Sequence, residues 1–289
     1  MLFSTAGIPF SAKKPGMVAG LQEVRSLSLG GCEWEFVRGV RFNPAHAKEV
    51  GEAAKRENVS LSCHAPYFLN LLSDETKKKG YSHHLILESA RMLNGAVVAG
   101  APCGDGGGRV VFHAGYYLKK PPQQAMNEMR EEFKLLLKKK KEERLRVVFA
   151  PELTGKPSAW GSLNELCALC GEFSLDDFNP CIDFAHYLAR GNALSASADY
   201  EKVFDSLKTS LGIEALLSLH CHFSGIRFSE KGEINHLPIA ANAPPFAPLA
   251  EALRKKRCGG TIVCESPLNE KDALEMQRVY SASAAPSKK

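Results

Sequence analysis

The stretch Val147-Val148-Phe149-Ala150-Pro151-Glu152 (VVFAPE) is apolar for five residues and ends on a carboxylate. A run without polar and apolar alternation is typical of a strand that is buried on both faces of a parallel sheet. β-rich runs recur along the whole chain, and with this one they make eight, at residues 2–6, 33–37, 59–64, 109–113, 147–152, 180–183, 216–220 and 261–265. The sequence therefore predicts eight parallel strands.

Segments with the apolar spacing of helices separate the predicted strands. They are clearest at residues 84–98, 125–137, 163–170 and 249–253. Eight strand–helix units with no linker or change in composition between them favour a closed (β/α)8 barrel, or TIM barrel, over an open sheet. We predict a single α/β barrel domain over residues 1–280, followed by a flexible tail at residues 281–289 (SASAAPSKK).

The composition is that of a soluble globular protein, with 44% hydrophobic and 24% charged residues. No apolar run approaches the roughly 18 residues of a membrane span, and the first ten residues do not resemble a secretory signal. We therefore expect a cytoplasmic protein without a membrane partner. Nine cysteines, an odd number spread over predicted strands and helices, favour reduced thiols over a disulfide framework.

The formal net charge of +5 is compatible with a polyanionic partner but does not establish one. The most concentrated basic run, at residues 138–141, continues a predicted helix and is expected to form a solvated face. Three glycines at residues 106–108 precede a strand instead of linking a strand to a helix. We expect a turn there, on the face of the barrel opposite the strand ends, and not a phosphate cradle.

Metal-ligand side chains stand at the C-terminal ends of six consecutive predicted strands, the edge where TIM barrels build their active sites. They are His64, His113, Glu152, Asp183 with His186, His220, and Glu265. A single histidine at a strand end is usually a hydrogen-bonded structural residue, but six consecutive strands that end on nitrogen or oxygen donors predict a metal site.

The mixture of imidazoles and carboxylates suits Zn²⁺, and Mn²⁺ fits the same ligands. One ion can be held by Glu152, Asp183, His220 and Glu265. Donors for additional ions are His64, His113, His186 and His236. We expect two or three ions. Such a cluster suits in-line displacement at phosphorus, because one ion activates a water molecule and the others stabilise the charge that develops on the phosphate.

The motifs that carry these ligands resemble those of the endonuclease IV family of apurinic/apyrimidinic endonucleases, from about Leu2 to Pro267. They follow in the family's order: His64-Ala65-Pro66-Tyr67 with Leu69-Asn70-Leu71, the segment around His113, Glu152-Leu153-Thr154 with Gly161-Ser162, Asp183 with His186, and Glu265-Ser266-Pro267. The resemblance implies a zinc-dependent enzyme of base excision repair, associated with the nucleoid during repair, that hydrolyses the phosphodiester 5′ to abasic sites in double-stranded DNA.

The resemblance also implies roles for individual residues. Glu152 would bridge two ions and act with Glu265 as a catalytic carboxylate. His64 and His113 would bind the first ion. The second ion would be held by Asp183, His220 and Glu265, and the third by His186 and His236.

Two positions leave alternatives open. The family commonly offers Asp-Arg-His where this chain has Glu233-Ile234-Asn235-His236, so Ile234 stands in place of the aspartate. Glu233 could reach the third ion with altered spacing, water could fill the position, or the ion could bind weakly. In addition, His220 and His222 alternate with period two and face the same side of their strand. The place in the motif favours His220.

Basic residues on the loops at the strand ends are the candidates for DNA contacts. The principal ones are Arg38, Arg227 and Lys231, and the same loops carry Arg41, Lys119, Lys120, Lys156 and Arg190. Tyr67, beside His64, could stack or wedge at the lesion. We expect double-stranded DNA as the partner and a monomeric protein.

Two other classes of function compete with this hypothesis. A metal-dependent sugar isomerase or epimerase of the xylose-isomerase-like barrel group would need only the quartet of Glu152, Asp183, His220 and Glu265, and the four further histidines argue against it. A non-enzymatic DNA-binding or scaffold protein that has kept a barrel is disfavoured by the nearly complete ligand set.

Overall fold

Eight parallel strands form the centre of the molecule in the computed structural model, which describes residues 1–104 and 108–283. Their order in the sheet is β5-β4-β3-β2-β1-β10-β7-β6. The strands are β1 (Leu2–Ala6), β2 (Gly31–Glu35), β3 (Ser60–His64), β4 (Gly108–Phe112), β5 (Val147–Pro151), β6 (Cys181–Asp183), β7 (Leu219–Phe223) and β10 (Gly260–Cys264).

The sheet closes on itself between its two end strands, β5 and β6. The Phe149 amide donates to the Asp177 carbonyl at 2.9 Å, and the Leu153 amide donates to the Cys181 carbonyl at 3.0 Å. Parallel bridges join Phe149 with Phe178 and Glu152 with Cys181. The predicted TIM barrel is therefore confirmed.

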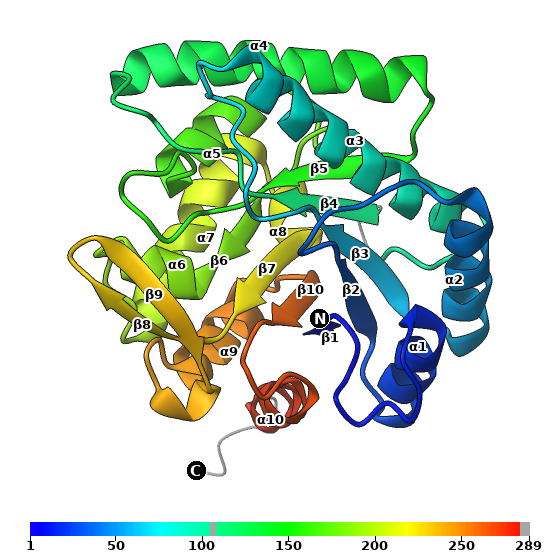
Figure 1. Ribbon diagram of the computed structural model, residues 1–289. Helices are drawn as coiled ribbons and strands as arrows, with labels where there is room; N and C mark the ends of the chain where they lie inside the picture. Colours follow the sequence, from blue (N-terminus) through cyan, green and yellow to red (C-terminus); the bar gives the residue numbers. More distant parts are fainter. Residues whose placement is uncertain (105–107, 284–289) are drawn as a thin grey trace.

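Helices surround this barrel, as Figure 1 shows. They are α1 (Met17–Ser26), α2 (Pro44–Glu57), α3 (Thr76–Val98), α4 (Pro122–Glu142), α5 (Leu163–Cys170), α6 (Phe184–Ala189), α7 (Ser197–Leu211), α8 (Glu214–Leu217), α9 (Phe246–Lys255) and α10 (Glu270–Ala282), with a 3-10 turn at Ile239–Ala241. In the described part of the chain, no helix is both long and apolar enough to cross a membrane.

The helices pack onto the barrel through apolar side chains, many of them aromatic. The ring of Phe133, on α4, stacks on Phe178 with ring centroids 4.5 Å apart and meets Phe112 of β4 edge to face at 6.2 Å. Both faces of the strands are buried, which explains their nearly continuous apolar sequences. The helix predicted at residues 163–170 has the observed bounds, and the other three predicted helices extend further than their apolar spacing indicated.

Two strands are displaced along the chain by more than one residue from their predicted positions. The predicted strand at residues 33–37 is found at Gly31–Glu35, and the one predicted at residues 216–220 is found at Leu219–Phe223. In the second case the apolar residues Leu216 and Leu217 belong to the short helix α8 instead. The shift by three residues changes which histidine stands near the end of β7.

An antiparallel hairpin, β8 (Gly225–Ser229) with β9 (Gly232–Leu237), follows β7 and was not predicted. It contacts α6 and lies outside the ring of parallel strands, in amber in Figure 1. Its two-residue turn, Glu230-Lys231, is not one of the usual hairpin pairs such as Asn-Gly, and the flanking residues are too mixed in polarity to show a clear alternation.

Several smaller predictions can be compared with the structure. All nine cysteines are free thiols. The basic run at residues 138–141 ends helix α4, where Lys138 and Lys139 lie near Glu142 but Lys140 is buried and pairs with Asp177 at 2.6 Å. Gly108 begins β4, whereas residues 106 and 107 of the glycine run lie outside the described residues. Helix α10 continues to Ala282, two residues into the predicted tail, and residues 284–289 also lie outside the described part.

Candidate metal centre

The first group of possible ligands comprises His64, His113 and Glu152, from the ends of β3, β4 and β5. The Nε2 atoms of both histidines lie 2.9 Å from the same oxygen, Oε2 of Glu152. His64 Nδ1 donates to the Ala65 carbonyl at 2.6 Å, which leaves its Nε2 facing the carboxylate. Two imidazole nitrogens and one carboxylate oxygen thus converge on one point, as ligands of a single ion do.

The other oxygen of Glu152 belongs to a second group. Its Oε1 lies 3.3 Å from His222 Nδ1, and the same nitrogen lies 3.3 Å from Oε1 of Glu265. Asp183 completes this group, whose four donor atoms lie within 4.8 Å of one another. Glu152 therefore stands between the two groups, with one carboxylate oxygen directed at each.

Asp183 is held by a local hydrogen bond that follows from its position in the sequence. It ends β6 and is the N-cap of α6, where its Oδ1 accepts a hydrogen bond from the His186 amide at 2.7 Å. Its Oδ2 remains free for the centre and lies 3.3 Å from His186 Nδ1. The strand-to-helix turn thereby brings Asp183 and His186, three residues apart, to the same place.

The third group comprises Asp183, His186 and His236. His186 Nδ1 lies 2.9 Å from the Leu153 carbonyl and His236 Nδ1 lies 3.1 Å from the Glu265 carbonyl, so each neutral ring would carry its proton on Nδ1. The two Nε2 atoms then face each other at 3.4 Å with their lone pairs. Two such lone pairs repel unless a proton or a cation lies between them, and 3.4 Å is close to the spacing of two ligands of one ion.

Glu233 also reaches this third group, despite its altered spacing. Its Oε2 lies 2.8 Å from His186 Nε2. The hairpin is docked by a hydrogen bond from the Glu233 amide to the Gly155 carbonyl at 3.1 Å. A side chain at Gly155 would collide with the Glu233 carboxylate, so the close approach requires glycine there. Ile234, in contrast, is 54% exposed and belongs to none of the ligand groups.

The geometry reverses the preference between the two histidines of β7. His222 lies in the group with Glu152 and Glu265, whereas His220 lies one alternation deeper in the barrel. There its Nε2 contacts Glu33 at 3.0 Å. The cause is the displacement of β7, because with a strand that ends at Phe223 it is His222 that stands near the rim.

Several buried donor atoms of these groups have no hydrogen-bond partner among the described residues. They are His113 Nε2, Glu152 Oε1, Asp183 Oδ2, His222 Nδ1 and Glu265 Oε2. Buried polar atoms without partners are costly in a folded protein. Their concentration at one place, with imidazole and carboxylate donors only, fits a centre of divalent ions such as Zn²⁺.

The charges of the centre shift the pKa values of its members. Burial lowers the pKa of His64, but the hydrogen bond to Glu152 and the charge of that residue outweigh it and raise the pKa to about 9. Burial raises the pKa of Glu265, but the charge of His222 outweighs it and lowers the pKa to about 2. Burial raises the pKa of Asp183 to about 6. Without ions the site therefore holds imidazolium–carboxylate pairs, and an ion must displace protons to bind.

Sequence reasoning missed two carboxylates of β2, Glu33 and Glu35. Glu33 is fully buried, and Glu35 lines the cavity above the centre. Glu35 Oε2 accepts a hydrogen bond from the Tyr67 hydroxyl at 3.0 Å, while burial raises the pKa of Glu35 to about 8. Glu33 lies inside β2 and Glu35 ends it, but the strand was predicted at residues 33–37, which placed its end at Val37 instead of Glu35. Two glutamates alternating within such a run were the available signal.

A cavity of about 530 Å³ opens over the ligands at the C-terminal ends of the strands. Its floor includes His113, His186, His236 and Glu265, and its walls include Phe10, Val37, Tyr67, Tyr116 and Lys156. Tyr67 is 37% exposed and its ring lies 4.5 Å from that of His64. The centre is therefore accessible from solvent on the face where a TIM barrel binds its substrate.

The candidate DNA-binding residues divide into two kinds. Arg38, Arg227 and Lys231 are exposed, Arg38 after β2 and the other two on the hairpin. Two others are engaged in internal contacts: the Arg190 guanidinium donates to the carbonyls of the β5–α5 loop, and Lys120 pairs with Asp74 and Glu128. The free cationic groups that the sequence placed around the mouth are thus fewer than predicted.

Comparisons with known proteins agree with this architecture. A family model described as a xylose isomerase-like TIM barrel matches residues 21–282. The uncharacterized protein MJ0133 of Methanocaldococcus jannaschii is 33% identical over 282 residues, 97% of each chain. The structure is similar to that of endonuclease IV from Thermus thermophilus, with a TM-score of 0.71 and 17% identity over 97% of this chain and 98% of that one. A D-tagatose 3-epimerase-like protein also has a TM-score of 0.71, with 15% identity over 96% of each chain. At these identities the two solved structures show the fold alone.

Proposed function

The chain belongs to the xylose isomerase-like TIM barrel family, and from this premise we propose that it is a zinc-dependent endonuclease that hydrolyses the phosphodiester 5′ to abasic sites in double-stranded DNA. The observation that carries the proposal is the convergence of three ligand groups under one open cavity, linked by Glu152 and Asp183, which each belong to two groups. An enzyme that needs one or two ions has no use for the histidines of the third group.

Each ligand group would hold one ion. His64 and His113 would hold one, His222 and Glu265 a second, and His186 and His236 a third. Bound zinc ions would supply Lewis acid stabilisation of phosphate charge and an activated water molecule. The fold is shared with endonuclease IV of Thermus thermophilus and is therefore compatible with this reaction.

The protein's own side chains would position the ions and the substrate. Carbonyl groups fix the ring orientations of His64, His186 and His236, and such outer contacts set the affinity and geometry of metal ligands. Arg227 and Lys231 of the hairpin stand on the exposed side and would bind flanking phosphates. Tyr67 lies between the first ion group and the cavity mouth, where it would stack on an extrahelical nucleotide.

One observation favours a second candidate, a metal-dependent sugar isomerase or epimerase. Glu35 directs a carboxylate into the cavity, and its Oε1 has no hydrogen-bond partner among the described residues. Above its raised pKa of about 8 the ionised group would repel a phosphodiester, and in either protonation state it can accept hydrogen bonds from sugar hydroxyl groups. The fold, shared with the D-tagatose 3-epimerase-like protein, is equally compatible with this alternative.

The two functions are separated by one set of assays on the purified, zinc-loaded protein. A labelled duplex with a single tetrahydrofuran abasic analogue is incubated with the protein, with and without EDTA, and parallel reactions contain a panel of ketoses and aldoses. Incision 5′ to the analogue, abolished by EDTA and restored by zinc, is the expected result. Metal-dependent turnover of a sugar with no incision would overturn the endonuclease and establish the alternative.

A further inference from the structure

Glu33 is a fully buried carboxylate below the metal centre, and it contacts both histidines of β7. Its Oε1 lies 2.9 Å from His222 Nε2 and its Oε2 lies 3.0 Å from His220 Nε2. Ser62 of β3 donates to the same Oε2 at 2.6 Å. An isolated buried carboxylate would be strongly disfavoured, but Oε2 of Glu33 accepts hydrogen bonds from Ser62 and His220. The contact of its Oε1 with His222 Nε2 is short but is not aligned as a hydrogen bond. These contacts with β3 and β7 compensate the burial of Glu33, a residue of β2, and connect three strands inside the barrel.

The two nitrogens of His222 face different groups. Nδ1 points to Glu152 and Glu265 of the proposed centre, at 3.3 Å from an oxygen of each, and Nε2 points to Glu33. A neutral imidazole has one protonated nitrogen and one free lone pair. If Nε2 carries the proton and faces Glu33, the lone pair on Nδ1 is directed at the ion.

We propose that Glu33 is a positioning residue that fixes the ring and the tautomer of His222, so that Nδ1 is available to the ion held with Glu152, Asp183 and Glu265. The inference rests on the proposed metal centre but not on the reaction that the centre performs. A carboxylate that accepts the second N–H of a metal-bound histidine orients the ring and strengthens the ligand, and its loss typically weakens metal binding by about 10- to 100-fold.

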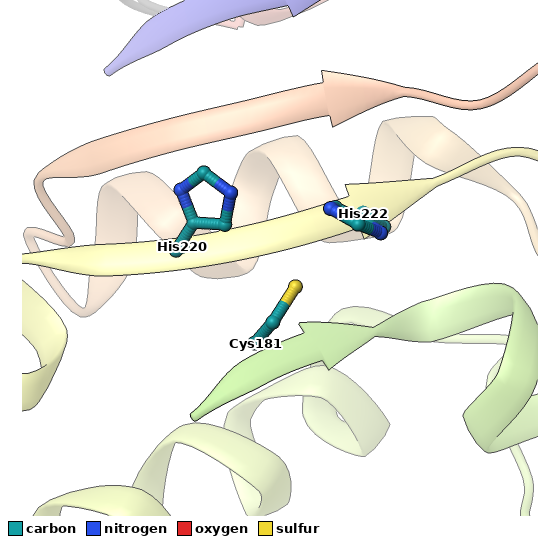
Figure 2. Close-up of side chains that lie close together, drawn as sticks. All are labelled: Cys181, His220 and His222. Carbon is teal, nitrogen blue, oxygen red and sulfur yellow. The ribbon is translucent and has the colours of Figure 1, made fainter. Parts of the chain in front are cut away.

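Cys181 raises a competing explanation of the same side chains. Figure 2 shows Cys181 of β6 beside His220 and His222 of β7, and one donor atom of each lies within 4.8 Å of the others. A further ion at this deeper point would need ring nitrogens of His220 and His222. The Nε2 atoms of both contact Glu33, and Nδ1 of His222 faces the upper group, so an ion that used His222 at this deeper point would have to displace one of these contacts.

The tautomer can be read directly in the unmodified protein. The zinc-loaded, ¹⁵N-labelled chain is studied by long-range ¹H–¹⁵N correlation of the histidine rings, with His222 assigned by comparison with His222→Gln. We expect a proton on Nε2 of His222 and the signature of a metal-bound nitrogen at Nδ1. A proton on Nδ1, or zinc at Nε2, would overturn the proposal. This measurement needs no activity and no variant that lacks Glu33.

Glu33→Gln tests the energetic consequence. The amide keeps the shape but presents a donor to one of the two imidazoles, so we expect one zinc ion to bind about 10- to 100-fold more weakly in chelator competition. Glu35→Gln is the matched control, since it makes the same substitution two residues along β2, where the carboxylate contacts Tyr67 instead of a β7 histidine. Unchanged zinc affinity in Glu33→Gln, or an equal loss in both variants, would contradict a specific positioning role.

Cobalt substitution tests the competing explanation. A thiolate ligand gives Co²⁺ a charge-transfer band in the near ultraviolet that imidazole and carboxylate ligands do not give. We expect the cobalt-loaded protein to lack this band and to have the same spectrum as Cys181→Ser. A band that disappears in Cys181→Ser would show an ion at the deeper point and would overturn the role of Glu33 as a hydrogen-bond acceptor for both histidines.

Discussion

Glu152→Gln is the substitution with the largest expected effect, because this residue presents one carboxylate oxygen to each of the first two ligand groups. Its Oε2 faces His64 and His113, and its Oε1 faces His222. Removing this negative charge should therefore weaken the binding of two ions at once. Perturbed outer contacts of metal sites can weaken metal binding by roughly 100-fold. If the affinity for each ion falls by at least that factor, the combined loss is at least about 5.5 kcal/mol of binding free energy.

Two assays on Glu152→Gln check this expectation. Elemental analysis after dialysis against a weak chelator should find two fewer zinc ions than in the wild type, and incision of the abasic duplex should fall below detection. DNA affinity should be nearly unchanged, because Glu152 is fully buried and does not line the cavity. His64→Gln is the matched control and should lose one ion. A Glu152→Gln protein that kept its zinc but no longer bound DNA would refute the bridging role.

Three further predictions concern protons, packing and charge. Zinc affinity in chelator competition should rise between about pH 6.5 and 9, because the pKa of His64 is about 9 and zinc must displace its proton. The raised pKa of His64 also stabilises the ion-free fold below pH 6.5, and urea unfolding of the ion-free protein should show this stabilisation lost as the pH rises to 9. Gly155→Ala should displace the Glu233 carboxylate, because the new side chain would collide with it. The fold should lose about 1–3 kcal/mol of unfolding free energy, and zinc titration should show that one zinc ion binds more weakly. Unaltered zinc binding would show that Glu233 is not a ligand. In the double variant Arg227→Ala, Lys231→Ala, the affinity for duplex DNA should depend less steeply on salt, with the negative slope of log K against log salt reduced in magnitude by about 2. Lys138→Ala on the outer helix should leave this slope unchanged, and equal effects of the two changes would place DNA on another face.

Much of the fold could be predicted because the repeating strands and helices of a TIM barrel each have a distinct sequence pattern. The doubly buried strands are nearly continuous in apolar residues, as in VVFA at residues 147–150, and the buried helix faces repeat with helical spacing. The position of β7 could not be predicted as well. Leu216 and Leu217 extend its apolar run backwards although they fold as α8, and His220 and His222 interrupt its apolar character just where the strand continues.

The same error decided which histidine was chosen. For strands whose ends were placed within one residue, as with His64, the sequence put the ligand at the rim where the structure has it. For β7, a shift of three residues moved the choice to His220. Glu35 was missed for the same reason, since it ends β2 but the strand was predicted to end at Val37, and Glu33 was missed because it lies inside the strand and not at its end. Distances across a barrel interior depend on register between strands, which a single sequence does not contain.

The positions of the ions themselves test the central claim most directly. Anomalous diffraction at the zinc absorption edge, from crystals of the zinc-loaded protein, locates each ion without reference to any assay of function. We predict one peak between His64, His113 and Glu152 and a second among Glu152, Asp183, His222 and Glu265, with a third beside His186 and His236. Zinc bound elsewhere, or a zinc-loaded crystal with no peak at the rim of the barrel, would contradict the account.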